Sequence, residues 1–179
     1  MVIMTARSAL AAGLLAAGLA VAPVAQAATI VLANGPAPGD SFTNAGGMNQ
    51  GQAIGATGWV YNNVRNGGAV GISTALPRSG NGSAAFTSPS GAAKADIEYL
   101  AAPLALAGNY VAAGALGAFA DLVSFGYDWY RYGSSTAAAS LHPALRVLLD
   151  ADGDLASIGD RGGLVFERAY NGGPTPTDA

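Results

Sequence analysis

The chain of 179 residues has no cysteine, which excludes disulfide bonds and metal sites built on thiolate ligands. Charged residues are scarce, with eight Lys or Arg against eleven Asp or Glu, and Lys94 is the single lysine. Because phosphate binding needs a basic face, this balance argues against nucleic acid as a partner. After residue 27 no apolar run reaches the ~20 residues of a transmembrane helix, so the mature chain is not expected to span a membrane.

The first 27 residues have the three parts of a secretory signal peptide. Arg7 is their only charge, residues 9–22 are apolar, and Ala25-Gln26-Ala27 supplies the small residues that precede a cleavage site. The apolar run is short for a membrane-spanning helix; a retained anchor is the alternative. We therefore predict a protein that is secreted or held at the cell surface. Cleavage leaves 152 residues with a net charge of −4, enough chain for one domain with a hydrophobic core.

Glycine is abundant, with 26 residues, and turn sequences divide the mature chain into short segments. Asn66-Gly67-Gly68 predicts a hairpin, because Asn and Gly accept the positive φ of a tight turn. The pattern predicts an all-β fold, an antiparallel β-sandwich of jelly-roll or concanavalin-like type. The expected divisions are a signal peptide 1–27, a lead-in 28–57 that belongs to the domain, the sandwich 58–172 and a tail 173–179. Strands are expected at residues 58–65, 69–74, 83–87, 92–100, 121–132, 143–150 and 163–170.

Aromatic residues are concentrated in the segment FGYDWYRY, residues 125–132, which holds five of the chain's fourteen aromatics. Strand alternation places one set of side chains inward, in the core: Phe125, Tyr127 and Trp129. The other set faces outward, beside two charged residues of neighbouring strands if those strands pair. This outer face predicts a sugar-binding surface for extracellular polysaccharide, although an ordinary solvated sheet face is the alternative. The candidate ligand-binding residues are Asp128, Tyr130, Tyr132, Arg146 and Glu167.

Several stretches in order carry a resemblance: GWVYNNVRNGG, PRSGNGSAAF, KADIEYL, DLVSFGYDWYR, HPALRVLLDADGD and LVFERAYNG. Over residues 57–172 the chain resembles the N-terminal domain of exported bacterial proteins that carry a PEP-CTERM sorting signal, the substrates of exosortase. The sorting tail of that family does not follow, since the sequence ends in NGGPTPTDA, as expected for either a truncated or a released protein. The resemblance implies a jelly-roll-like sandwich, export, and a role in the extracellular polysaccharide or biofilm matrix. It implies no catalytic residues.

An acidic stretch, DADGD, follows the strand expected at 143–150. Alternating carboxylates in a loop can supply several of the six to eight oxygen ligands of calcium. An EF-hand is excluded, because its sixth and twelfth positions would be Leu155 and Arg161 instead of Gly and Glu. The alternative is a simple connection in which Asp and Gly serve turn geometry. The candidate ligands of a structural calcium ion, the only cofactor expected, are Asp150, Asp152, Asp154 and Asp160.

The segment KADIEYL resembles a Glu-x-Asp-x-Glu motif of one glycosidase family with a concanavalin-like sandwich. Alternation places Lys94, Asp96 and Glu98 on one face, with Ala95, Ile97 and Tyr99 on the other face. Lys94 occupies the position of the first Glu, so the expected nucleophile is missing. No serine has a nucleophile elbow around it, and His142 stands alone. We expect a non-catalytic binding or structural module; the alternative is a glycan-active enzyme that uses Asp96 and Glu98 as a carboxyl pair.

Overall fold

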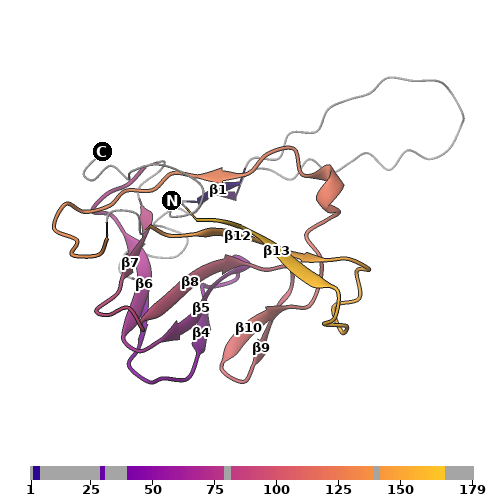
Figure 1. Cartoon of the computed structure of the whole chain (residues 1–179), viewed down its shortest axis with the longest axis horizontal. Coiled ribbons are helices and arrows are strands. Elements are labelled where there is room, and N and C mark those ends of the chain that lie inside the picture. Colours follow the sequence, from indigo (N-terminus) through magenta and orange to yellow (C-terminus); the bar gives the residue numbers. More distant parts are fainter. Residues whose placement is uncertain (1, 5–28, 31–39, 79–81, 139–141, 168–179) are drawn as a thin grey trace, which may run out of the picture.

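The computed structural model describes residues 2–4, 29–30, 40–78, 82–138 and 142–167. The regular secondary structure of these residues consists of antiparallel strands and one short 3-10 turn at Phe119–Asp121 (Figure 1). The prediction of an all-β, antiparallel fold is confirmed. The described part contains no helix with the length and apolar character that crossing a membrane requires. Most of the predicted signal peptide, residues 1 and 5–27, lies outside the described residues.

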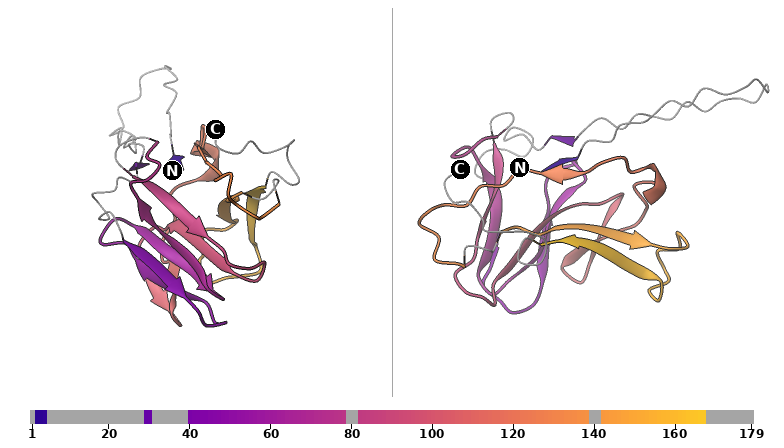
Figure 2. Two further views of the ribbon diagram at one scale, coloured as in Figure 1. Left: turned by 90° about the vertical axis from the view of Figure 1, so that its left-hand side faces the viewer. Right: turned by 45° about the horizontal axis from the view of Figure 1, so that its top comes forward.

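Two three-stranded sheets form the centre of the molecule, and their faces pack against each other (Figure 2). The chain passes between the sheets three times, since β3 and β4, β5 and β6, and β7 and β8 each belong to different sheets. The first sheet has the order β3 (Ser41–Asn44), β6 (Gly68–Ser73), β7 (Ser83–Thr87). The second has the order β4 (Gln50–Ala53), β5 (Trp59–Arg65), β8 (Lys94–Tyr99).

The hydrophobic core lies between these sheets and is centred on Tyr61, which is fully buried. β5 supplies three of the six residues of the buried cluster, and β6 supplies two; each of these strands has a neighbour on both edges. The predicted inner face of the 94–100 segment is confirmed, since its three apolar side chains pack on this core. Burial of each large side chain contributes about 1.5–3 kcal/mol. The buried cluster is Ile54, Trp59, Tyr61, Val64, Val70 and Ile72, and Phe42, Phe86, Ala95, Ile97 and Tyr99 pack against it.

The predicted hairpin at residues 66–68 is wrong, although its turn conformation is as expected. Asn66 and Gly67 have φ of 53° and 77°, but β5 and β6 do not pair with each other. Their side chains face each other across the core instead, so the turn connects two sheets. Gly68 lies at this crossing, where an added Cβ would clash with the backbone carbonyl of Lys94. Only glycine fits there without a backbone shift.

Three smaller sheets complete the described structure. β9 (Pro103–Leu106) and β10 (Asn109–Ala112) form one hairpin, and β12 (Leu145–Asp150) and β13 (Arg161–Phe166) form another. The third has the order β11 (Gly126–Tyr127), β1 (Val2–Met4), β2 (Thr29–Ile30). β1 falls within the predicted signal peptide, so cleavage after Ala27 would remove the strand that pairs with β11.

Two strand predictions need correction. The segment 121–132 forms a strand only at Gly126–Tyr127, and its inward residues Phe125, Tyr127 and Trp129 are half-buried and do not belong to the core cluster. This segment pairs with one short strand, so it lacks the two covering neighbours that bury β5. The lead-in 28–57, for which no strand was predicted, contains β3 and β4. These edge strands pair with the sheets through backbone hydrogen bonds. They carry few apolar side chains, so their sequence does not show the pattern expected of a strand.

Candidate functional site

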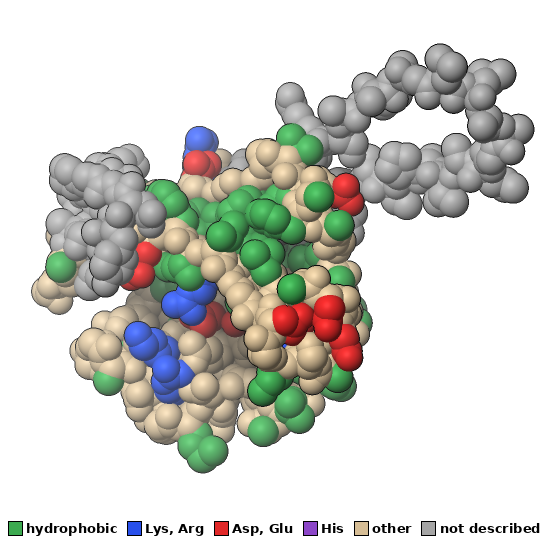
Figure 3. All heavy atoms as spheres, turned by 45° about the vertical axis from the view of Figure 1, so that its right-hand side comes forward, with side chains coloured by type: hydrophobic (Ala, Val, Ile, Leu, Met, Phe, Trp, Pro, Cys, Tyr) green, Lys and Arg blue, Asp and Glu red, His purple; other side chains and the backbone are tan. Residues whose placement is uncertain are grey.

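An open groove runs between the outer face of β8 and the layer formed by β12 and the segment 113–132. Figure 3 shows the molecule hollowed on one face, with basic and acidic side chains beside each other in the hollow and apolar side chains above it. The space is about 3550 Å³, several times the roughly 300–1,000 Å³ of a small-molecule pocket. These dimensions suit an extended ligand better than a compact one.

Asn62 is the buried polar residue of the groove floor, with 6% of its surface exposed. Its Nδ2 donates to Glu98 Oε2 at 2.8 Å and to the carbonyl oxygen of Tyr110 at 2.9 Å. The backbone N–H of Tyr110 donates back to Asn62 Oδ1 at 3.0 Å. One amide side chain thus joins β5, β8 and β10 and fixes Glu98 at the groove. The sequence analysis missed Asn62; its signal was a polar residue in the middle of the apolar strand WVYNNVR.

Asn63 holds the second carboxylate of the floor. Its Nδ2 donates to Asp96 Oδ2 at 2.8 Å. Neighbouring residues of a regular strand point to opposite faces, yet Asn62 and Asn63 both reach carboxylates on the same face of β8. A φ of 52° at Asn63 and a register shift between Asn62 and Arg65 explain this. Such bulges redirect side chains and are over-represented next to active sites.

The surroundings of Glu98 shift the pKa of its carboxyl group. Burial raises its pKa above the usual 4.5, and the nearby Asp96 charge adds to the rise, while the Asn62 hydrogen bond and the Arg146 charge oppose it. In the described part of the chain no ion pair within 4 Å joins Asp96 or Glu98 to a basic group. The two carboxyls therefore lie in the groove held by amides and are not neutralised by direct salt bridges.

Substituting Glu98→Gln tests the electrostatics of this floor. A carboxyl whose pKa is raised on folding costs stability as pH rises from its unfolded pKa through its folded pKa. The amide keeps an oxygen that can accept from Asn62 but has no charge to bury. We expect the variant to melt at a higher temperature than the wild type at pH 7, with the difference vanishing toward pH 4, measured by calorimetry. Asp121→Asn, at an exposed carboxylate, controls for the lost charge. A Glu98→Gln variant less stable than the wild type at pH 7 would contradict the expectation.

The five predicted sugar-binding residues all line the groove, although the strand pairing expected to bring them together is not formed, because β11 pairs with β1. Tyr130 and Tyr132 are exposed and meet edge to face, with ring centroids 5.6 Å apart. Asp128 forms a 3.2 Å salt bridge with Arg78. Arg146, on β12, and Glu167, after β13, contribute to the same lining.

Trp129 and His142 form a stacked aromatic contact in the lining of the groove. Their rings stack with centroids 5.1 Å apart and planes inclined by 18°. Tyr127 Oη lies 2.8 Å from His142 Nδ1. The stacking holds the Trp129 ring against the wall and gives the single histidine of the chain a packing role that the sequence did not indicate.

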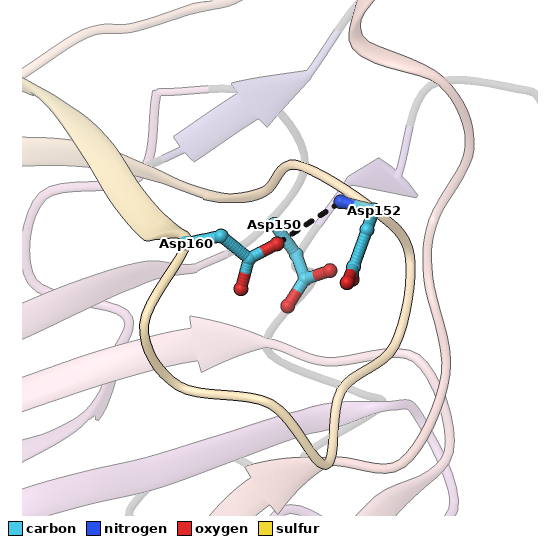
Figure 4. Close-up of side chains that lie close together, drawn as sticks. All are labelled: Asp150, Asp152 and Asp160. Carbon is cyan, nitrogen blue, oxygen red and sulfur yellow. Dashed lines mark hydrogen bonds between the residues drawn. The ribbon is translucent and has the colours of Figure 1, made fainter.

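The acidic loop between β12 and β13 brings three of its four candidate calcium ligands together. One carboxylate oxygen from each of Asp150, Asp152 and Asp160 lies within 4.8 Å of the others, and the three side chains converge in Figure 4. Asp154 does not belong to this group. Three converging carboxylates repel one another unless a cation binds, and Arg161 Nε, 3.6 Å from Asp150 Oδ2, is the basic group beside them.

The same carboxylates also serve the turn. Asp150 Oδ1 accepts from the Gly153 N–H, and Asp160 Oδ2 accepts from the Asp152 N–H at 3.1 Å. Asp154 Oδ1 accepts from the Ala156 N–H at 2.9 Å. The Ser157 hydroxyl donates to Asp160 and is the main cause of the lowered pKa of that carboxyl. Turn geometry and a cation site are therefore compatible in this loop.

Comparison of the chain with protein-family models, with curated proteins and with solved structures finds no match.

Proposed function

We propose that this chain is an exported, non-catalytic β-sandwich module that binds an extended glycan in the groove beside β8. The observation that carries the proposal is the bulge in β5. It turns Asn62 and Asn63 toward the same side, where they hold Glu98 and Asp96 in an open groove whose opposite wall is aromatic. Amide and carboxyl groups hydrogen-bond sugar hydroxyls, and aromatic rings supply an apolar face for the sugar ring.

The setting of this function follows from the amino-terminal residues and from the resemblance described above. A signal peptide at 1–27 would deliver the domain outside the cell. The likeness to exported PEP-CTERM proteins favours extracellular polysaccharide of the biofilm matrix as the ligand, with the protein secreted or held at the cell surface. A calcium ion bound by Asp150, Asp152 and Asp160 would stabilise the loop at one end of the groove, where Asp150 and Asp152 also contribute to the lining.

Tyr130→Ala is expected to weaken glycan binding by about tenfold while leaving the fold intact. Removing an aromatic ring that stacks on a nucleic-acid base costs about 1–3 kcal/mol, and we expect a loss at the lower end of this range for a sugar ring. Tyr130 is 38% exposed, so the fold depends little on it. A glycan array on the exported protein would identify a ligand, and calorimetric titration would compare the variants.

Tyr130→Phe is the matched control, because it keeps the ring and removes only the hydroxyl. It should bind within a few-fold of the wild type if stacking is the main contribution. Failure of every arrayed polysaccharide to bind, or equal binding by the wild type and Tyr130→Ala, would count against the groove as a glycan site.

A second candidate function is glycoside hydrolysis, favoured by one observation: Glu98 has a raised pKa beside Asp96 in the groove. A protonated acid next to an ionised carboxylate is the pairing that glycosidases use. Residues two apart on a strand have Cα atoms about 6.6 Å apart, which allows the carboxyl spacings of either glycosidase mechanism. Release of reducing ends from a bound polysaccharide, lost in Glu98→Gln while binding is kept, would distinguish the enzyme from the binding module.

A further inference from the structure

β13 presents a free edge. In the described part of the chain this strand pairs only with β12, and the hairpin extends to the side of the molecule (Figure 2, right). All six β13 residues are exposed, including Leu164 at 46%, Val165 at 52% and Phe166 at 44%. A two-stranded ribbon is at best marginally stable in water, and a long apolar edge readily accepts another strand. We therefore expect the free edge of β13 to pair with another strand.

We propose that the partner is β13 of a second copy of this chain, paired antiparallel about a two-fold axis at Leu164. The strand and the residue after it read Arg161-Gly-Gly-Leu-Val-Phe-Glu167. In this register Arg161 lies opposite Glu167 of the second copy, and Leu164 lies opposite Leu164. The result is a four-stranded sheet in the order β12, β13, β13, β12. This inference does not rest on the proposed glycan site, although Glu167 also lines the groove.

Size complementarity supports that register. Phe166 lies opposite Gly162 of the second copy, and Val165 lies opposite Gly163. A Cβ added at Gly162 would meet nothing within 4 Å, so there is room above this glycine for the Phe166 ring. Aromatic side chains that cover glycines across a strand pair are a known stabilising arrangement in sheets. Phe166 and Val165 thus each face a glycine. The open space is at Gly162, because a Cβ added at Gly163 would lie 3.1 Å from the carbonyl oxygen of Val147.

Charge complementarity supports it as well. Asp150 lies opposite Arg161 in the β12–β13 register, and their charged groups are 3.6 Å apart. Glu167 of the second copy would lie on the other side of Arg161. Three adjacent strands would then carry a row of charges: Asp150, Arg161 and Glu167 of the second copy. Opposite charges facing each other across strands are stabilising. The two-fold axis repeats the row at the other end of the pair, as an isologous interface requires.

Leu164→Lys and Leu164→Glu test the proposal together. Each variant places two like charges opposite each other at the axis, which should raise the dimer dissociation constant by about tenfold or more. Mixing the two variants should restore dimers, because the introduced lysine of one chain then faces the introduced glutamate of the other. Oligomeric state would be measured by gel filtration with light scattering on protein expressed from the full sequence, and circular dichroism would report folding of each variant.

Ile158→Lys is the matched control, since Ile158 is 77% exposed in the loop before β13 and away from the proposed axis. It should dimerise like the wild type. A wild-type protein that stays monomeric over a wide concentration range overturns the proposal. Folded single variants that still dimerise, or a mixture that does not, overturn the two-fold axis at Leu164. If the protein dimerises but binds no glycan, the proposed glycan site is contradicted and the dimer proposal is supported.

Discussion

Trp59→Ala is expected to lower the free energy of unfolding by about 3–5 kcal/mol, the usual cost of truncating a large buried aromatic. Trp59 is 4% exposed, belongs to the core cluster and packs on Tyr99 with ring centroids 5.3 Å apart. Small domains have only about 5–15 kcal/mol in total, and this chain has no disulfide to compensate. The variant should therefore melt far below the wild type or fail to fold, as measured by chemical denaturation.

Trp129→Ala is the matched control, because it is the same change at the other tryptophan of the chain. Trp129 is half-buried and its main described contact is the stacked ring of His142. The expected loss is about 1–2 kcal/mol, in line with one aromatic pair and partial burial. If Trp129→Ala were the more damaging change, the core would lie around the segment 125–132, and the assignment of β5 as the central strand would be wrong.

The contrast between the two tryptophans shows what local pattern can predict about this fold. Strands β5, β6, β7, β8 and β12 were expected from short apolar runs between turn residues, and they are present. Alternation also predicted which side chains of β8 face the core. Pattern could not predict which strand is central, because burial depends on neighbours distant in sequence. Strand alternation predicted that Phe125, Tyr127 and Trp129 lie in the core, yet their segment pairs with another strand over two residues only.

The same limit applies to the groove. Five candidate ligand residues were proposed from strand alternation, and they share one groove, but through contacts other than the predicted strand pairing. Asn62 was not proposed at all, since its partners Glu98 and Tyr110 lie 36 and 48 residues away. A bulge such as that at Asn63 depends on the register between two strands. Sequence periodicity therefore predicts neither the distant partners of Asn62 nor the bulge at Asn63.

The closeness of the candidate ligands in the acidic loop is easier to predict, because these residues are near each other in sequence. A β-hairpin brings Asp150 opposite Arg161, so residues 150–160 must close into a compact loop. Three carboxylates converge in it, and the fourth, Asp154, instead accepts from the Ala156 N–H. An aspartate inside the converging group can therefore be compared with Asp154, an aspartate of the same loop outside it.

Calcium is expected to raise the melting temperature of the protein by about 3–10 °C. A ligand that binds only the folded state stabilises it by RT ln(1 + [L]/Kd), about 2.7 kcal/mol at a hundredfold excess over Kd. Extracellular calcium sites typically have Kd values of about 0.1–1 mM, and each kcal/mol shifts the melting temperature of a domain of this size by roughly 2–4 °C. Differential scanning calorimetry with calcium or with a chelator would measure the shift.

Asp152→Asn should abolish the rise, whereas Asp154→Asn should keep it. Both changes remove one negative charge from the same loop, and both leave a side-chain oxygen that can accept the turn hydrogen bonds, at Asp154 N and Ala156 N respectively. Only Asp152 contributes an oxygen to the converging group. Loss of a carboxylate from the converging group should therefore separate the variants, while loss of a carboxylate elsewhere in the loop should not. Equal shifts in both variants, or no shift in the wild type, would leave turn geometry as the sole role of these aspartates.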